Sequence, residues 1–267
     1  MSAASTFASE SGEGYELQMG RWSRRLAPRF LDFSGVSAGS VLDVGCGTGS
    51  LSFCLADMSR IAGVVGLDLS PPYIDYARRA RCDEHLTFLT GDACALPFPD
   101  GAFDQSLSML ALQFVREPEL AIREMCRVTR PGGTVAAATW DTRGGFVAFR
   151  MIVDAAAMLD GTGSELRARS CTRPMSRPGD LARAWREAGL QGIAEDMLTI
   201  RMDYECFEDF WAPSEGREGP IAEYVHSLQQ CSKARLKDAV RRAYLDGEGD
   251  GARSYAATAW VVRGTVA

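Results

Sequence analysis

The sequence predicts an α/β protein whose core is a doubly wound, seven-stranded and mostly parallel sheet. From residue 41, short apolar runs alternate with helical segments of about ten to fifteen residues, as in strands joined by crossover helices. The runs are almost continuously apolar, which is typical of strands covered by helices on both faces. With 267 residues, 46% of them hydrophobic, the chain is long enough to bury such a core.

The first half of the chain carries five of the expected strands. The first of them, "VLDVGC", is a β-branched run that ends among glycines. The expected strands are 41–46, 63–69, 86–92, 102–110 and 133–140. The helices expected between them are 50–58, 71–82 and 118–129, the last of which ends at "RPGG".

The second half departs from this rhythm after Trp140. Residues 144–190 are predicted to form two helices around a connection rich in Arg and Pro, and the second helix ends at the glycine of "EAGL". Residues 193–204 are expected to form a strand, 222–245 a helix and 254–264 the final strand.

Composition and charge argue against several classes of protein. The net charge of −6 and the pI of about 5.1 give no basic surface for nucleic acid. No apolar run approaches the roughly 20 residues that cross a bilayer. The first residues lack the basic and apolar regions of a secretory signal, so a cytoplasmic protein is expected. Eight scattered cysteines without a C-x-x-C pair predict free thiols and no metal site.

The stretch "VLDVGCGTGS" places Gly45, Gly47 and Gly49 between a strand and a helix. Glycines let the backbone turn sharply and approach a ligand closely, and the helix start behind them offers free N–H groups. The dinucleotide fingerprint G-x-G-x-x-G is spaced differently, and Ser50 stands in place of its third glycine. Asp43 brings a carboxylate to the same strand end, which disfavours a pyrophosphate and favours a cationic ligand. Alternatively, Asp43 only caps the glycine turn.

Two further acids end the next two expected strands. Asp68 lies at the tip of the second strand, where a carboxylate accepts both ribose hydroxyls of a nucleoside. Asp92 ends the third strand, where it is placed to accept from the exocyclic amine of adenine. An acid at each of three successive strand ends, together with the glycine loop, predicts a site for an amino acid joined to adenosine.

These motifs together resemble the class I S-adenosylmethionine-dependent methyltransferases, in particular the bacterial branch related to the ubiquinone and menaquinone biosynthesis methyltransferases. The resemblance covers nearly the whole chain. It rests on "YELQMGRWSRRLAPRFLDF", "VLDVGCGTGSLS", "GLDLS", "GDACALPFPDGAFD" and "REMCRVTRPGGTV", and more loosely on "FWAPSEGREGPIAEYVHSL" and "ATAWVVRG".

The resemblance implies a Rossmann-like fold in which an antiparallel last strand inserts beside the fifth strand. A single methyltransferase domain over residues 1–267 is expected. Within it we expect an N-terminal helical segment (1–35), a cofactor-binding core (36–142) and two cap insertions that contact the substrate (143–180 and 203–250).

A binding site for S-adenosyl-L-methionine is also implied by the resemblance. The glycines hold its methionine part, Asp68 its ribose, and Asp92 with Ala93 its adenine. The N-terminal segment closes over the cofactor, with Tyr15 nearby and Arg21 pairing with the methionine carboxylate; a plain amphipathic helix packed on the sheet is the alternative. The implied cofactor residues are Tyr15, Arg21, Asp43, Gly45, Cys46, Gly47, Gly49, Asp68, Leu69, Asp92, Ala93 and Ser108.

One tetrapeptide, "SPPY" (70–73), is similar to the active-site motif of amino-group methyltransferases, which is Asn or Asp, two prolines and an aromatic residue. In those enzymes the motif follows the fourth strand, whereas "SPPY" follows the second. Ser70 is a natural N-cap, and Pro71 suits the first helical turn because no N–H is required there. We therefore expect "SPPY" to begin a helix.

The sequence indicates the residues that bind the methyl acceptor less clearly than those that bind the cofactor. Gln113 and Phe114 follow the fourth strand, and Trp140 and Arg143 follow the fifth, where acceptor contacts arise in this fold. An O- or C-acceptor may need a base to remove its proton, and His226 and Gln113 are the candidate catalytic residues. The other histidine, at position 85, precedes the third strand at the end away from the cofactor and is expected to be structural.

A basic segment suggests the charge of the acceptor. Residues 161–186 contain six arginines and two acids in a chain whose net charge is −6. Because arginine recognises carboxylate and phosphate through a planar fork of donors, we expect an anionic acceptor held by Arg169, Arg173 or Arg177. A solvated surface loop is the alternative.

The sequence thus predicts a cytoplasmic S-adenosylmethionine-dependent methyltransferase that acts on a small molecule by in-line displacement. Two alternatives stay open. One is a non-catalytic S-adenosylmethionine-binding protein, because this reaction needs no obligatory side chain. The other is a nicotinamide dinucleotide oxidoreductase, which the glycine spacing and Asp43 disfavour.

Overall fold

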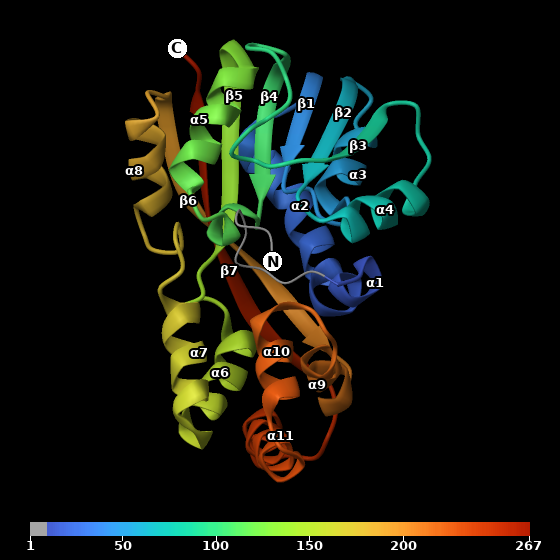
Figure 1. The fold of residues 1–267 in the computed structure, drawn as a ribbon, viewed down its shortest axis with the longest axis vertical. Helices are drawn as coiled ribbons and strands as arrows, with labels where there is room; N and C mark the ends of the chain where they lie inside the picture. Colours follow the sequence, from blue (N-terminus) through green and yellow to red (C-terminus); the bar gives the residue numbers. More distant parts are fainter. Residues whose placement is uncertain (1–9) are drawn as a thin grey trace.

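Seven strands form one sheet in the order β3-β2-β1-β4-β5-β7-β6 (Figure 1). The computed structural model describes residues 10–267. Strands β1 to β5 run parallel, and β7 runs antiparallel to both of its neighbours, β5 and β6. The predicted sheet, with an antiparallel last strand beside the fifth, is confirmed. The strands are β1 (Gly39–Val44), β2 (Ile61–Asp68), β3 (Leu86–Thr90), β4 (Phe103–Met109), β5 (Thr129–Trp140), β6 (Gln191–Tyr204) and β7 (Arg253–Thr265).

The helices fall into an N-terminal group, a group between strands and a group in the second half. Short turns of π-helix (η1) and 3₁₀-helix (η2) accompany them. Their bounds are α1 (Gly12–Tyr15), η1 (Glu16–Gly20), α2 (Arg21–Ser34), α3 (Ser50–Ala56), α4 (Pro71–Ala80), η2 (Leu112–Phe114), α5 (Pro118–Val128), α6 (Val147–Leu159), α7 (Gly161–Cys171), α8 (Asp180–Glu187), α9 (Phe207–Glu215), α10 (Gly219–Ser227) and α11 (Gln230–Leu245).

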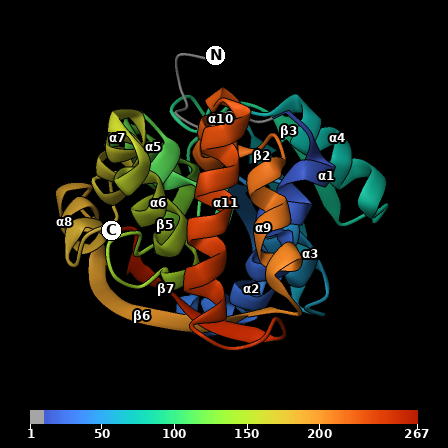
Figure 2. The ribbon, with the colours of Figure 1, turned by 90° about the horizontal axis from the view of Figure 1, so that it is seen from below.

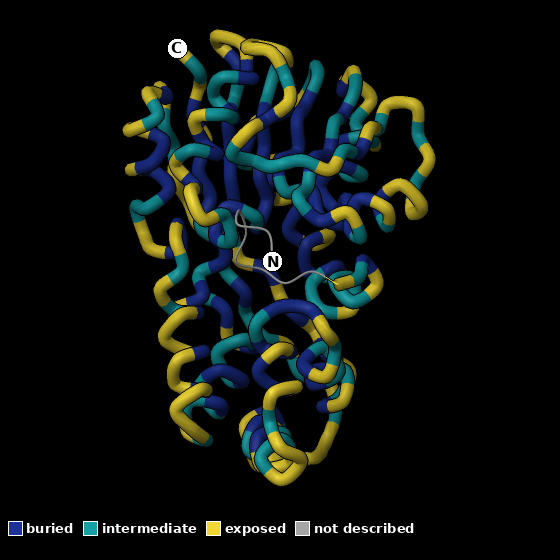
Figure 3. Tube along the Cα trace, in the orientation of Figure 1, coloured by how far each residue is buried: buried dark blue, intermediate teal, exposed yellow. Residues whose placement is uncertain are grey.

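Helices cover both faces of the sheet because alternate strand residues point to opposite sides. On one face, Trp22 and Leu26 of α2 pack with α3 against strand residues that include Val41. On the other face, α5 and α8 pack against Leu42 and Val135. Helix α4 packs against Phe88 of β3 on the same face as α2 and α3. The central strands are accordingly the most deeply buried part of the chain (Figure 3).

The second half contains more helices than the sequence predicted. The first helix expected within 144–190 is two helices, α6 and α7, because the side chain of Asp160 accepts from the N–H of Gly163 at 2.6 Å and starts a new helix. The helix expected over 222–245 is likewise divided into α10 and α11, because Leu228 and Gln229 have extended backbones. Helix α9 was not predicted.

Helices α6, α7, α9, α10 and α11 lie beyond the carboxyl ends of the parallel strands (Figure 1). Seen from that end, α10 and α11 lie between the pair α6–α7 and α9 (Figure 2). This helical group is called the cap below. No helix within residues 10–267 is long and apolar enough to cross a membrane.

Candidate functional site

A cavity of about 500 Å³ opens at the carboxyl ends of the parallel strands. The ends of β1, β2 and β3 line one side of it, and the residues after β4 and at the end of β5 line the other. The N-terminal segment contributes Tyr15, Gln18 and Met19 to its wall. This edge of a doubly wound sheet is where ligands bind in such folds.

The glycine loop has the backbone that its sequence predicts. Gly45, Gly47 and Gly49 all have positive φ, at 73°, 55° and 94°. A Cβ on Gly45 would overlap the side chain of Ala111, so this glycine is required by the fold. A Cβ on Gly47 would meet nothing closer than the ring of Tyr15 at 3.9 Å. Gly47 therefore presents open space to the cavity that it lines, as expected where a ligand approaches the backbone.

The carboxylate of Asp68 joins the glycine loop to the end of β2. One oxygen accepts from the N–H of Gly47 and the other from the N–H of Ser70, both at 2.9 Å. Burial raises the pKa of Asp68 above its usual value. Asp92 lines the cavity after β3, the strand next to β2, and its Oδ1 accepts from the N–H of Cys94 at 2.9 Å. Both acids thus lie at the cavity as predicted.

Asp43 lies behind the glycine loop and does not line the cavity. Its side chain is 1% exposed, and Oδ2 accepts from the hydroxyl of Ser52 at 2.7 Å. Its Oδ1 is buried and has no partner within the described residues. Burial raises the pKa of Asp43 to about 7, and the nearby charge of Asp68 adds to this shift. An unpaired acidic oxygen beside the loop favours a cationic ligand there.

The shifted pKa of Asp43 predicts a pH-dependent stability. Between pH 3.8 and pH 7 the folded protein holds a proton that the unfolded chain has released, so stability falls as pH rises through this window. Asp43→Asn keeps the site neutral at every pH. Its free energy of unfolding should match the wild type near pH 4 and exceed it at pH 8, by on the order of 4 kcal/mol. Urea unfolding at the two pH values measures the difference.

Asp104 provides the matched control. Its carboxylate accepts from Ser40 and pairs with Arg130, and these contacts lower the pKa of Asp104 to about 2. Asp104→Asn should therefore lose stability at neutral pH, the opposite sign. An Asp43→Asn protein with the same advantage at pH 4 and pH 8 would show that Asp43 does not titrate in this range.

The N-terminal segment covers the cavity. Its wide turn η1 carries Glu16, whose Oε1 accepts from the hydroxyl of Thr48 in the glycine loop at 2.6 Å. The Tyr15 ring lies 5.1 Å from the ring of Tyr73, and burial raises the pKa of Tyr15 to about 12. Tyr15 lines the cavity, and its contact with the cofactor stays a prediction.

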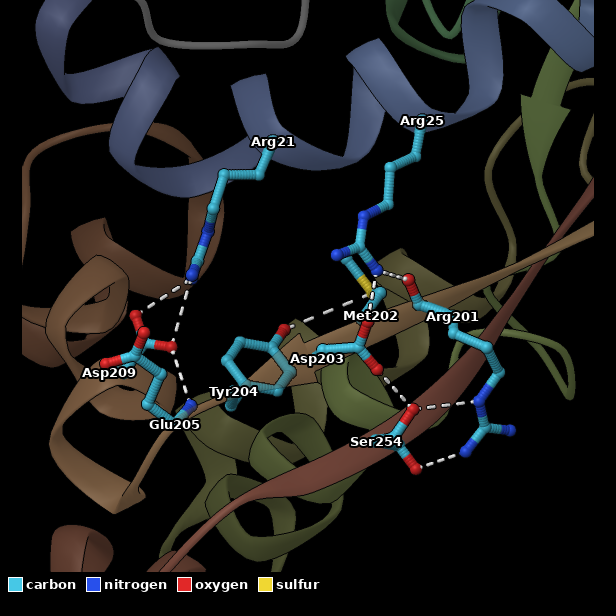
Figure 4. A network of polar contacts seen from close by, with 9 residues as sticks. All are labelled: Arg21, Arg25, Arg201, Met202, Asp203, Tyr204, Glu205, Asp209 and Ser254. Atoms are coloured by element: carbon cyan, nitrogen blue, oxygen red, sulfur yellow. Dashed lines mark hydrogen bonds and ion pairs between the residues drawn. The ribbon is translucent and has the colours of Figure 1, made fainter.

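Arg21, unlike Tyr15, does not lie at the cavity. Its guanidinium makes two hydrogen bonds to the carboxylate of Asp209 in α9, at 3.0 and 3.1 Å (Figure 4). It also sits over the rings of Trp22 and Tyr204. Because Asp209 already neutralises it, Arg21 ties α2 to the cap and does not line the cavity. Trp22 is 2% exposed, so the inward-facing amphipathic helix is the correct description of α2.

"SPPY" begins a helix, as predicted. Ser70 is the N-cap of α4 and accepts from the N–H of Tyr73, and Pro71 occupies the first position. The same residues also line the cavity. The hydroxyl of Tyr73 donates to Glu218 at 2.7 Å.

Glu218 joins three segments around the cavity. Its carboxylate is 1% exposed and also accepts from the N–H groups of Glu10 and Ser11, and its carbonyl accepts from the side chain of Gln18 at 2.8 Å. The cap, the start of α4 and the N-terminal segment thus meet at one buried carboxylate.

Tyr73→Phe should loosen this junction without stopping catalysis. Loss of a hydrogen bond to a carboxylate predicts a fall of about 1–2 kcal/mol in the free energy of unfolding. Urea unfolding measures this fall, and amide exchange over residues 10–20 should become faster.

Tyr76→Phe is the control, because within the described chain no hydrogen bond of the Tyr76 hydroxyl occurs. A loss of about a thousandfold in methyl transfer by a folded Tyr73→Phe protein, the size expected for a lost acid or base, would instead assign "SPPY" to the chemistry.

Four polar or aromatic side chains line the β4–β5 side of the cavity, and three of them were predicted as acceptor contacts. Gln113 is 2% exposed, and its Oε1 accepts from the N–H of Trp140 at 3.0 Å. Phe114 follows it in η2. The buried Nε1 of Trp140 and Oγ of Ser108 have no partner within residues 10–267. Buried polar groups without partners are costly, and a ligand that accepts hydrogen bonds would satisfy them.

Of the predicted arginines, the structure brings Arg173 next to the cavity. Its guanidinium carbon lies 4.5 Å from the centre of the Phe114 ring. Arg143 and Arg177 are exposed and line no part of the cavity, because both lie in loops that face outward. His226 is also exposed, and its Nε2 lies 2.8 Å from the carbonyl of Gly216. The opposite face of α10 is buried, so His226 points away from the site.

The remaining predicted cofactor residues differ in their placement. Leu69 and Ala93 line the cavity. Cys46 is buried against α4 and β3, and Gly49 caps α3, so both support the loop from behind. Sequence reasoning missed Gln18 and the apolar residues after β4 that line the cavity. Nothing in "YELQMG" (15–20) or "SLSMLALQF" (106–114) distinguishes these residues from core residues.

Comparisons with known proteins agree with this geometry. A model of the methyltransferase domain family matches residues 42–137. The chain is 42% identical to a demethylmenaquinone methyltransferase of Renibacterium salmoninarum over 123 residues, which cover 46% of this chain and 50% of that protein. It is 34% identical to a demethylmenaquinone methyltransferase of Roseiflexus castenholzii over 173 residues, which cover 61% of this chain and 73% of that protein.

A solved structure shares the fold. It is phosphoethanolamine N-methyltransferase 2 of Haemonchus contortus in complex with phosphomonomethylethanolamine and S-adenosylhomocysteine. The TM-score is 0.60 at 16% identity, and the match covers 96% of this chain and 57% of that chain.

The chain therefore belongs to the class I S-adenosylmethionine-dependent methyltransferase family, as its motifs predicted. It spans about half the length of the Renibacterium relative. Three observations indicate that the cavity fits the family's cofactor. Gly47 leaves room for a ligand at the loop, Asp68 and Asp92 line the adjoining wall, and Asp43 keeps an unpaired acidic oxygen behind it.

Proposed function

We propose that the protein transfers a methyl group from S-adenosylmethionine to a small-molecule acceptor by in-line displacement. The observation that carries this proposal is the junction of Gly47 and Asp68. The carboxylate holds the loop by the Gly47 N–H, while the open side of the same glycine faces the cavity. A glycine loop next to a strand-end acid suits a ligand with a cationic amino-acid part and a ribose.

The protein's own residues align the methyl donor with the acceptor and exclude water from the site. Bound S-adenosylmethionine supplies a methyl carbon on a positively charged sulfur, and its displacement leaves a neutral thioether. Asp68 and the glycine loop fix the donor side, Tyr15 and Met19 cover it, and Gln113 walls the acceptor side. Positioning of this kind accounts for up to about 7–11 kcal/mol of the barrier.

The acceptor in this proposal is a small molecule with an anionic group, rather than nucleic acid. The cavity of about 500 Å³ suits a small molecule, and the net charge of −6 disfavours a polyanion. The relatives named for demethylmenaquinone support a small-molecule acceptor. Arg173 beside Phe114 supports the anionic group.

Calorimetry and a labelled methyl group test the proposal. The protein should bind S-adenosylhomocysteine but not NADH, and mass spectrometry of ligands released by denaturation should find the same nucleoside. Label from S-adenosylmethionine should pass to a member of a panel of quinols and aromatic acids. Binding without transfer to any acceptor would favour the non-catalytic alternative, and binding of NADH alone would favour the oxidoreductase.

A further inference from the structure

Two hydrogen-bond donors on the β4–β5 side of the cavity have no acceptor in the described part of the chain. The backbone of Trp140 fixes the amide of Gln113 through Oε1, which leaves the Nε2 protons without a partner. No carboxylate within residues 10–267 pairs with the guanidinium of Arg173. Desolvated donors of this kind gain most from a charged oxygen.

Arg173 lies beside two rings that line different cavities, and its own side chain is part of neither lining. Its guanidinium carbon is 4.5 Å from the ring centre of Phe114, which lines the main cavity, and 6.0 Å from that of Phe149. Phe149 lines a second, apolar cavity of about 70 Å³, which shares Gln18 and Met19 with the first. A ligand whose apolar body contacts Phe114 or Phe149 would therefore lie near the guanidinium.

We propose that the acceptor binds and reacts as a planar oxyanion, a carboxylate or phenolate, held by the Arg173 guanidinium and the Gln113 amide. Its apolar body lies against Phe114 and Phe149. This inference rests on the proposed methyl transfer and adds that the acceptor loses its proton before the reaction, to water and not to the protein.

The titratable groups around the site support an acceptor that is already ionised. Tyr15, Asp68, Tyr73 and Asp92 line the opposite side. Burial raises the pKa of both tyrosines, which stay protonated at neutral pH, and Asp68 is engaged by two backbone N–H groups. Arg169 and Cys171 are the charged or titratable groups that act on Arg173, and burial with Arg169 lowers its pKa to about 10. Arg173 therefore stays cationic at neutral pH.

The transfer step balances without a base. A lone pair of the oxyanion forms the new bond to the methyl carbon, the carbon–sulfur bond breaks, and its electron pair stays on the sulfur. One negative and one positive charge disappear, and no proton is released in this step. The cation of Arg173 favours the ionised acceptor in the preceding equilibrium.

A comparison of the affinities of a carboxylate and the matching amide tests whether the site prefers an anionic ligand. In the protein saturated with S-adenosylhomocysteine, 2-naphthoate should bind at least about tenfold more tightly than 2-naphthamide by calorimetry. Arg173→Met should remove this preference and leave the affinity for S-adenosylhomocysteine unchanged. Arg186→Met, an equal change of charge at an exposed position of the same basic segment, should leave the preference intact.

Equal binding of acid and amide, or equal effects of the two arginine variants, would overturn the proposal. Binding of S-adenosylhomocysteine is measured separately from the preference for the acid. Either of these outcomes would therefore leave the methyltransferase assignment unchanged. If Arg173→Met does not fold, Arg173→Lys keeps the charge without the planar fork and should lower the preference for the acid only in part.

The absorbance of 4-nitrophenol reports directly on ionisation of a bound acceptor. Its phenolate absorbs at longer wavelength than the phenol, so the bound and free molecules can be titrated separately. When bound it should ionise at lower pH than when free, and Arg173→Met, but not Arg186→Met, should abolish the shift. A bound molecule that stays protonated to higher pH, or that binds without competing with 2-naphthoate, would contradict the proposal.

Discussion

Gly47→Val should lower the affinity for S-adenosylhomocysteine by more than about a hundredfold. The substitution places a branched side chain in the open space that Gly47 presents to the cavity, where the ring of Tyr15 is the nearest neighbour at 3.9 Å. The backbone also resists the change, because φ is 55° and a β-branched residue is strained there. Calorimetry on the folded variant measures the loss.

Gly132→Val distinguishes the effect of backbone strain from the effect of a side chain that fills the cavity. Gly132 lies near the start of β5, remote from the cavity lining; its φ is 77°, and a Cβ there would meet no atom within 4 Å. Both variants should lose similar stability in urea, but Gly132→Val should keep its affinity for S-adenosylhomocysteine. Normal binding by Gly47→Val would mean that the loop is only a turn.

Asp68→Ala should weaken cofactor binding by about 1.5–3 kcal/mol, because charged hydrogen bonds to the ribose are lost. The structure adds a second cause, since the carboxylate also holds the N–H groups of Gly47 and Ser70. The loop and the start of α4 should therefore exchange their amide protons faster in the variant. Calorimetry with S-adenosylhomocysteine and amide exchange measure the two effects.

Asp104→Ala is the comparison for Asp68→Ala. Asp104 holds the N–H of Ser40 at the other end of the sheet, at 2.7 Å, so its loss should reduce stability and leave affinity unchanged. An unchanged affinity in a folded Asp68→Ala protein would remove the basis for assigning the nucleoside to this cavity.

Local patterns predicted the core of the fold and the donor side of the site. The glycine loop and the acids Asp68 and Asp92 could be placed because parallel strands bring their carboxyl ends to one edge, so residues at successive strand ends meet. The helix start at "SPPY" could be placed because capping is local chemistry. In these cases neighbours in sequence decide the structure.

Contacts between distant segments could not be predicted. The sequence gives no indication that Asp209 takes the charge of Arg21, or that Glu218 binds the backbone of Glu10 and Ser11. Each contact depends on how the cap packs against the N-terminal segment. Tertiary packing of this kind leaves no periodic pattern of residues in the sequence from which it could be predicted. The basic segment illustrates the same limit, because six similar arginines end in different environments and Arg173 alone is beside Phe114.

The wide turn η1 makes the length of the N-terminal segment as important as its composition. A π-helical turn contains one residue more than the equivalent stretch of α-helix. Loss of a single residue between Glu16 and Gly20 would restore regular winding and rotate everything before it by about 100° around the helix axis. Tyr15 would then turn away from Gly47. Insertions and deletions in these five residues should accordingly be rarer among functional homologues than substitutions at the exposed Leu17.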